Sequence, residues 1–144
     1  MIKKKIIPSV GVVAIRDDEV LLVKELEGSG HISGVFGLPS GRVNDDETEQ
    51  EAAAREFHEE TGLNAKVVDF REFKNNYFVA DIPRKDGTIK TFGWRGFKVQ
   101  NFYGQLSGND ETHPYWVDLD KLKTLDKKKL LLPNVIEIVN NALE

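Results

Sequence analysis

Residues 41–63 read GRVNDDETEQEAAAREFHEETGL, and no other part of the chain says as much about its structure and chemistry. Thr48 is followed three residues later by Glu51, which is a capping-box pattern at a helix start. Three alanines then favour a helix, and Gly62 supplies a C-terminal stop. These signals predict a helix over residues 49–61.

Three carboxylates share one face of this predicted helix. At 100° per residue, Glu56, Glu59 and Glu60 fall within an arc of about 100°. Like charges at this spacing destabilise an isolated helix, so a cation among them would offset the repulsion. A hard divalent ion with oxygen preference, Mg²⁺ or Mn²⁺, fits this donor set. Arg55 lies next to Glu59 on the helix wheel, and we expect it to orient Glu59 through a two-pronged hydrogen bond.

The stretch resembles the signature box of the Nudix hydrolases. That box is glycine, five residues, glutamate, seven residues, then Arg-Glu, an apolar residue, any residue, Glu-Glu, any residue, glycine and an apolar residue. All nine specified positions are filled between residues 41 and 63. The alternative meaning of such a charge run is a solvated acidic helix, and the fixed spacing argues against it.

The resemblance implies a fold and an activity. The fold class is α+β, an α/β/α sandwich with a mixed β-sheet. The activity is Mg²⁺-dependent hydrolysis of a phosphoanhydride bond in a nucleoside diphosphate linked to another group, with Mn²⁺ as a substitute ion. The implied metal ligands are Glu56, Glu59, Glu60 and the backbone carbonyl of Gly41. No organic cofactor is implied, and the expected partner is a small nucleotide substrate.

Further catalytic roles are left open by the resemblance. Arg55 belongs to the catalytic set, with Glu47 as its expected partner. The residue that takes the proton from water is Glu60, Glu56 or an acid outside the box. The family often has such an acid in the loop before a late tryptophan segment, here residues 108–113. We expect Glu111 rather than Asp110 to fill this position.

The identity of the substrate is not encoded in the box. A nucleoside triphosphate and a nucleotide sugar both remain open. The proline that marks ADP-ribose enzymes is replaced by Val79, and Ser40 stands where two adjacent glycines are common. Residues 25–35, which contain His31 and several glycines, are predicted to border the substrate mouth.

Composition limits the other possibilities. The 144 residues suit one domain, residues 1–144, and 40% apolar content is ordinary for a globular protein. A net charge of −4 gives no strong nucleic-acid signal, and the absence of cysteine is compatible with a reducing, cytoplasmic location. The apolar runs are too short to span a membrane. A homodimer is left open, and so is a second function class, a non-catalytic nucleotide-binding sensor of the same fold.

Outside the box, apolar periodicity and turn residues predict the remaining elements. We expect strands at residues 8–16, 20–24, 65–73, 77–82, 88–98 and 115–117, a loop at residues 25–35 and a helix that begins at Pro133. The apolar face of that last helix is expected to contain Val135, Ile136, Val139, Ala142 and Leu143.

Overall fold

A computed structural model describes residues 5–144 of the chain, so the first four residues of the predicted 1–144 domain lie outside the described residues. The main sheet has the strand order β3-β2-β1-β7-β6, with β4 paired to β1 and β9 paired to β2. Its strands are β1 (Ile6–Arg16), β2 (Glu19–Glu25), β3 (Phe36–Gly37), β4 (Ser40–Arg42), β6 (Tyr77–Pro83), β7 (Ile89–Val99) and β9 (Thr112–Asp118). A small second sheet pairs β5 (Leu63–Asn64) with β8 (Tyr103–Gly104).

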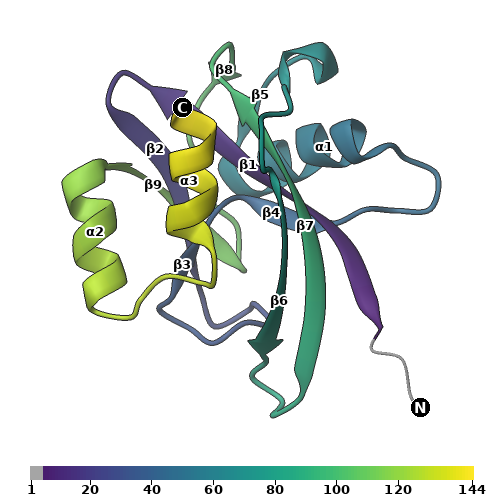
Figure 1. Cartoon of the computed structure of the whole chain (residues 1–144), viewed down its shortest axis with the longest axis vertical. Helices are drawn as coiled ribbons and strands as arrows, with labels where there is room; N and C mark the ends of the chain where they lie inside the picture. Colours follow the sequence, from purple (N-terminus) through teal and green to yellow (C-terminus); the bar gives the residue numbers. More distant parts are fainter. Residues whose placement is uncertain (1–4) are drawn as a thin grey trace.

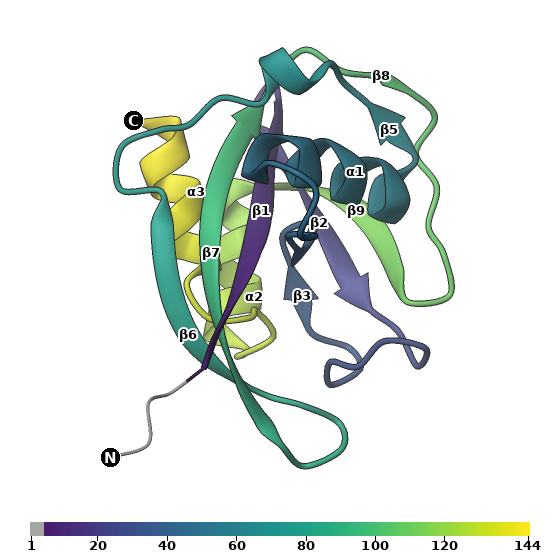
Figure 2. The same ribbon diagram turned by 90° about the vertical axis from the view of Figure 1, so that its right-hand side faces the viewer.

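The sheet is mixed because β1 and β7 run parallel, while the other pairs are antiparallel. Helix α1 (Glu49–Thr61) packs on one face, and α2 (Leu119–Lys127) and α3 (Val135–Leu143) cover the other, as Figures 1 and 2 show. This arrangement confirms the expected α/β/α sandwich.

The central strand β1 is buried on both faces, which explains its nearly continuous apolar sequence. Successive side chains of a strand point to opposite faces. Val10 and Val12 accordingly pack in the cluster formed with α1, whereas Val13 packs in the cluster formed with α2 and α3. The two halves of the core therefore share this strand.

Helix α1 begins and ends where the sequence predicted. Thr48 accepts a hydrogen bond from the backbone N–H of Glu51, and the Glu51 side chain accepts one from the N–H of Thr48, which completes the capping box. Gly62 ends the helix with a φ of 77°, a left-handed conformation that glycine adopts without a steric penalty. Ala52, Ala53 and Phe57 are buried against the sheet.

Strand β1 changes partners along its length. Near its end it pairs with β2 at Ile15 and Arg16, and further back it pairs with β4 at residues 9–11. Strand β2 continues away from β1 and pairs with β9 along its full length. This divergence leaves the end of β2, the short strand β4 and α1 around one cavity.

Two elements outside the box differ from the sequence predictions. Residues 65–73 do not form a strand: they contain a 3-10 helix (Val67–Asp69), in which Val68 is 73% exposed, whereas Phe70, which follows it, is buried. Helix α2 was not expected, because residues 119–127 are rich in lysine and only Leu122 and Leu125 are buried.

The C-terminal helix was placed correctly, but one face residue was not. Leu143 is 43% exposed, and Ile138, which was not expected on the apolar face, is buried instead. The predicted strand at residues 115–117 is also longer in the structure, because β9 pairs with all seven residues of β2.

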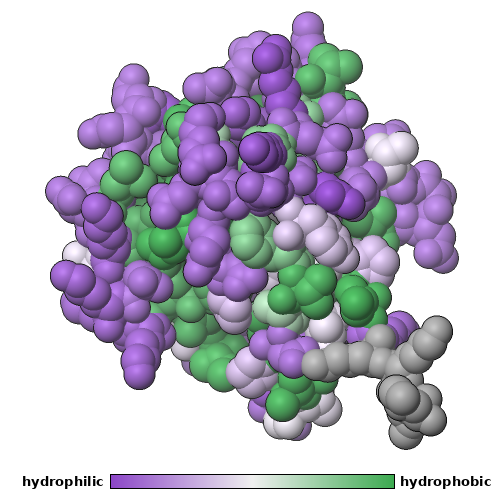
Figure 3. Space-filling view, in the orientation of Figure 1, coloured by the Kyte–Doolittle hydropathy of each residue, from purple (hydrophilic) through white to green (hydrophobic). Residues whose placement is uncertain are grey.

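The surface is polar over most of the face in Figure 3, and apolar residues gather in its lower half, where β6 and β7 run. Tyr77, Val79 and Ile89 are exposed apolar side chains of these two strands. Among residues 5–144, no helix combines the length and apolarity that a bilayer crossing requires.

Replacing Phe57 with alanine should lower the free energy of unfolding by about 3–5 kcal/mol, because its fully buried ring contacts Phe70 and Phe102 and its removal leaves a cavity in the core. Urea denaturation measures the change. His58→Ala is the matched control, since His58 is the next residue on α1 and is exposed. Equal stability of the two variants would contradict this view of the α1 interface.

Candidate active site

A cavity of about 260 Å³ lies where α1, β4, the end of β2 and the loop before β9 meet. Glutamates from three parts of the chain line it: Glu25, Glu56, Glu59, Glu60 and Glu111. The structure therefore brings together all four glutamates that the sequence analysis assigned to the site, and it adds Glu25.

Arg55 neutralises part of this negative charge through Glu47, its expected partner, and not through the fork that was expected to Glu59. Its Nε donates to Glu47 Oε2 at 3.1 Å and its Nη2 to Glu47 Oε1 at 2.6 Å, so the two-pronged hydrogen bond joins Arg55 to Glu47. Glu59 makes a single and longer contact with Arg55, from Oε2 to Nη1 at 3.4 Å, and its side chain is 53% exposed. The expected Arg55–Glu59 fork is wrong, because Glu47 in the preceding loop presents both carboxylate oxygens to the guanidinium.

Arg55 also fixes Glu56. Its Nη1 donates to Glu56 Oε1 at 2.6 Å, and its Nη2 donates to the backbone carbonyl of Arg42 at 2.8 Å. One guanidinium thus connects the loop before α1, the helix itself and β4. The hydrogen bonds from Arg55 are the main cause that lowers the pKa of the Glu47 carboxyl.

Strand β4 passes very close to the carboxylates of α1. A Cβ atom on Gly41 would overlap the carboxylate of Glu56, so only glycine allows this approach. The backbone N–H of Ser40 donates to Glu60 Oε1 at 2.6 Å. The glycine of the box therefore makes room for one glutamate, and its neighbour holds another.

Burial makes the charged form of three of these glutamates costly. It raises the pKa of Glu60 well above the usual value, against the opposing effect of the Ser40 hydrogen bond. It also raises the pKa of Glu56 and of Glu25, although Arg55 and Ser29 respectively act in the other direction. A half-buried group of like charges is therefore arranged to receive positive charge.

Glu25 was missed by the sequence analysis. It ends β2, is only 6% exposed, and accepts a 2.6 Å hydrogen bond from the Ser29 hydroxyl. A signal was present, because Leu21, Val23 and Glu25 alternate along the strand and must point to the same face. An acid that continues an inward-facing apolar row is a candidate site residue.

The loop before β9 brings Glu111 to the cavity. Its backbone N–H donates to Asn109 Oδ1 at 2.7 Å, and its carbonyl accepts from the N–H of Leu26 at 2.8 Å. Asn109 Nδ2 in turn donates to the carbonyl of Glu59 at 2.9 Å, which ties the loop to α1. Asp110 lines a neighbouring surface hollow instead of the central cavity.

His31 also lines the cavity, together with Arg84, Phe92 and Trp94, so the expected position of residues 25–35 at its mouth agrees with the structure. His113 lies elsewhere, against the ring of Tyr115 at a centroid distance of 4.9 Å.

The residues present fit a hard divalent cation. All five acids offer carboxylate oxygens, and the space beside Gly41 keeps Glu56 next to the β4 backbone. Within residues 5–144, no three acids are already gathered closely enough to hold an ion, and Arg55 occupies one oxygen of Glu56. Glu56, Glu59 and Glu60 would hold the ion after their side chains reorient.

A comparison with models of protein families identifies the family to which the chain belongs. A family model described as NUDIX domain matches residues 5–137. The chain belongs to the Nudix family. The chain is similar to an ADP-ribose pyrophosphatase from Methanocaldococcus jannaschii, with 44% identity over 129 residues, covering 86% of this chain and 71% of the relative.

Other Nudix proteins are similar over comparable lengths. An oxidized purine nucleoside triphosphate hydrolase from Danio rerio is 29% identical over 111 residues, which is 77% of this chain and 65% of the relative. The crystal structure of a MutT NUDIX hydrolase from Burkholderia pseudomallei has a TM-score of 0.71 at 21% identity, with 96% of this chain and 98% of that one covered. The chain spans between 21% and 65% of the length of four of its curated relatives.

The contribution of His31 to folding stability should fall as the pH falls from about 6.5 to about 4. Burial, and secondarily the charge of Arg84, lower the pKa of His31 from 6.5 to about 4. In this window the unfolded chain binds a proton that the folded chain does not, so protonation favours unfolding. With allowance for partial exposure of the ring, the loss is about 1 kcal/mol at pH 5.

Urea denaturation of wild type and His31→Gln at pH 7.5 and 5 measures this contribution, because the variant keeps every other titrating group. The free energy of unfolding of the wild type should fall more steeply with decreasing pH. Parallel losses in both proteins would mean that His31 is not held neutral by the fold.

Proposed function

We propose that this Nudix protein is a metal-dependent pyrophosphohydrolase that cleaves a phosphoanhydride bond in a nucleoside diphosphate linked to another group. The observation that carries the proposal is the convergence of Glu56, Glu59 and Glu60 on one cavity, with β4 packed against them at Gly41. The activities named for the relatives, on ADP-ribose and on oxidized purine nucleoside triphosphates, support it.

In this proposal Glu56, Glu59, Glu60 and the carbonyl of Gly41 hold Mg²⁺, and Mn²⁺ can replace it. The bound cation neutralises phosphate oxygens and lowers the pKa of the attacking water. Arg55 positions Glu56 through its 2.6 Å hydrogen bond and keeps its own place through Glu47. Arg55 and a bound cation would together offset the charge of the carboxylates, which alone would repel an anionic substrate.

Glu111 is the residue that we assign to proton transfer from the attacking water. Its backbone is fixed by Asn109 and Leu26, and the residue lines the cavity. Glu60 and Glu56 remain alternatives, but both are engaged, by the Ser40 N–H and by Arg55. An acid that is not a metal ligand keeps its lone pairs for the proton.

The alternative function, a nucleotide-binding sensor that does not hydrolyse its ligand, requires none of this machinery. Nothing in the box has been lost, and the half-buried glutamates would be a cost without a benefit in a protein that only binds. The hydrolase is therefore the stronger proposal. A cytoplasmic location, a single domain and a homodimer stay predictions.

Glu59→Gln and Glu60→Gln should each lower kcat by about 100-fold or more, because each removes a charged ligand. The measurement is phosphate release from a panel of nucleotides with Mg²⁺, with circular dichroism to confirm folding. Glu137→Gln, an exposed acid on α3, is the control and should keep wild-type activity. Hydrolysis that survives exhaustive chelation would refute the proposal.

Glu111→Gln should lower kcat by about 10²-fold with little change in KM, since proton transfer acts in the transition state and not on substrate binding. Asp110→Asn is the matched control, because it alters the adjacent residue outside the central cavity. A raised KM at constant kcat would instead assign Glu111 to substrate binding. If neither variant changes kcat or KM, Glu111 is a solvated loop residue without a catalytic role.

A further inference from the structure

Arg84 is a cation in a cavity dominated by carboxylates. It lines the same cavity as the glutamates and is half-buried. Among residues 5–144, the structure pairs Arg16, Arg55 and Arg95 with carboxylates in ion pairs but gives none to Arg84. A guanidinium that is partly removed from water without a carboxylate partner can accept an anionic group from a ligand.

The guanidinium is held in place by uncharged contacts. Its Cζ lies 5.9 Å from the ring centroid of Phe92, which stacks on Trp94. Its Nη1 is 3.4 Å from Nε2 of His31. It also packs against the backbone of Gly30, where a Cβ atom would overlap Nη2. These contacts orient the group without a hydrogen-bonded carboxylate, and the charge of Glu25 acts on it across the cavity.

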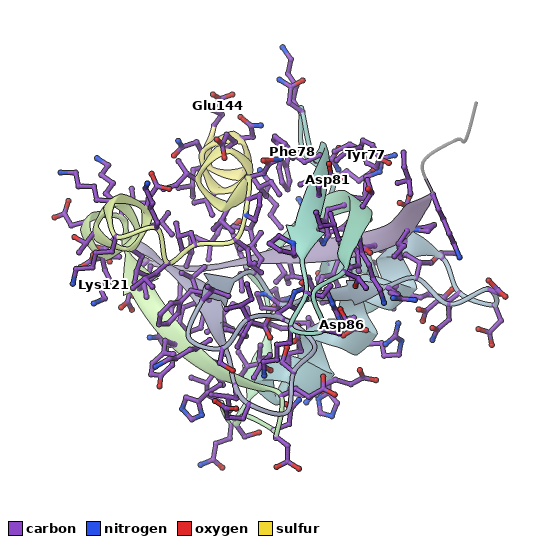
Figure 4. The ribbon with its side chains drawn as sticks, turned by 90° about the horizontal axis from the view of Figure 1, so that it is seen from below. Tyr77, Phe78, Asp81, Asp86, Lys121 and Glu144 are labelled. Carbon is purple, nitrogen blue, oxygen red and sulfur yellow. The ribbon has the colours of Figure 1, made fainter. Side chains whose placement is uncertain are left out.

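The backbone around Arg84 is fixed as well. The hairpin between β6 and β7, whose tip includes Asp86 in Figure 4, meets the loop of residues 26–34. His31 and Arg84 form a β-bridge, and Lys85 Nζ donates to the carbonyls of Leu26 and Glu27 at 3.1 and 2.7 Å.

The loop side of this contact is braced by Glu25. Its carboxylate accepts a hydrogen bond from the Ser29 hydroxyl. The hydroxyl oxygen of Ser29 in turn accepts one from the backbone N–H of His31 at 3.0 Å. The hairpin and the loop are both held by these contacts in the free protein. The Arg84 side chain therefore loses little conformational entropy when a ligand binds.

Arg84 and the α1 glutamates reach the cavity from different elements, the β6–β7 hairpin and α1. In Figures 1 and 2 the β6–β7 hairpin tip is at the bottom of the view and α1 is in the upper half. A ligand that contacts both must therefore extend along the cavity. The glutamate end suits phosphates that are held through a cation, and the Arg84 end suits an anion that binds directly.

We propose that Arg84 binds a phosphoryl group that lies beyond the diphosphate held at the glutamates, so that the preferred substrates are nucleoside triphosphates and not nucleoside diphosphates linked to a neutral sugar. This inference rests on the proposed function for the glutamate end of the site. A neutral sugar would leave the guanidinium without an acceptor of matching charge, whereas a terminal phosphate offers oxygens to its planar N–H groups.

The test compares ATP with ADP-glucose, which share a nucleoside diphosphate and differ in the group attached to it. Arg84→Ala should lower kcat/KM for ATP by about 10- to 100-fold, mainly through KM, and should change kcat/KM for ADP-glucose by less than about threefold. Arg84→Lys should recover part of the loss. Lys90→Ala is the matched control, because it removes a charge from the same hairpin outside the central cavity.

Equal losses for both substrates would overturn the inference, since Arg84 would then contact the shared nucleotide, and a loss that depends on the base would assign it to the base. No loss would overturn it too. Thermal unfolding of the variants keeps folding defects apart from binding defects, and Arg84→Lys provides a folded variant if Arg84→Ala is unstable.

Failure of the inference is distinguishable from failure of the proposed function. Calorimetric binding of an ATP analogue with carbon-bridged phosphates, in the presence of Mg²⁺, does not depend on hydrolysis. Binding that weakens about 10-fold or more in Arg84→Ala supports the inference even if wild type cleaves nothing. Equal binding to wild type and Arg84→Ala overturns it even if wild type cleaves ATP.

Discussion

The approach of β4 to α1 is the constraint on which the rest of the site depends. At this contact the backbone of residues 40–42 comes against a helix face that carries three glutamates, and each of the three β4 residues takes part. Ser40 donates to Glu60, Gly41 leaves room for Glu56, and the Arg42 carbonyl accepts from Arg55. Without this contact the carboxylates would lie on an exposed helix, where water would screen them.

The contact also explains why the box is so long in sequence. Arg55 must reach both Glu47 in the preceding loop and Glu56 on its own helix, so the loop has to fold back alongside the first turns of α1. The capping box at Thr48 fixes where that loop ends and the helix begins. The spacing of the family pattern thus has a local physical meaning in this chain: Glu47, Arg55, Glu56 and Glu60 are hydrogen-bonded around the contact and Gly41 clears space, while Phe57 packs in the core and Gly62 ends the helix.

Local patterns predicted those parts of the structure that depend on neighbours in sequence. Helix α1 was placed to the residue, because its capping box and terminal glycine act within a few residues of the helix ends. The strand at residues 65–73 was wrong, because a 3-10 helix interrupts the segment and only an isolated bridge from Arg71 to Lys98 joins it to β7, which leaves Val68 in water. Helix α2 was missed because two buried leucines in a lysine-rich segment give a weak periodic signal.

The same distinction separates the site residues that were found from those that were missed. The glutamates of α1 follow from one contiguous motif. Glu25 and Arg84 enter the cavity only through strand pairing and a hairpin contact between distant segments, which no local pattern contains. The fork of Arg55 to Glu47 instead of Glu59 likewise depends on the path of a loop. Charge and spacing identify candidates, and tertiary contacts select their partners.

The parallel pairing of β1 with β7 has a consequence for how the chain acquires its structure. Ile6 pairs with Thr91 and Ala14 with Val99, so the strand shared by both halves of the core has its principal partner far away in sequence. Contacts of such long sequence separation slow folding, because the loop must be closed before they contribute. On a ribosome that adds about 5–20 residues each second, the apolar β1 strand would wait several seconds for β7 to emerge. During that interval the edge of β1 that pairs with β7 stays without its partner, and only β2, β4 and α1 are available to it.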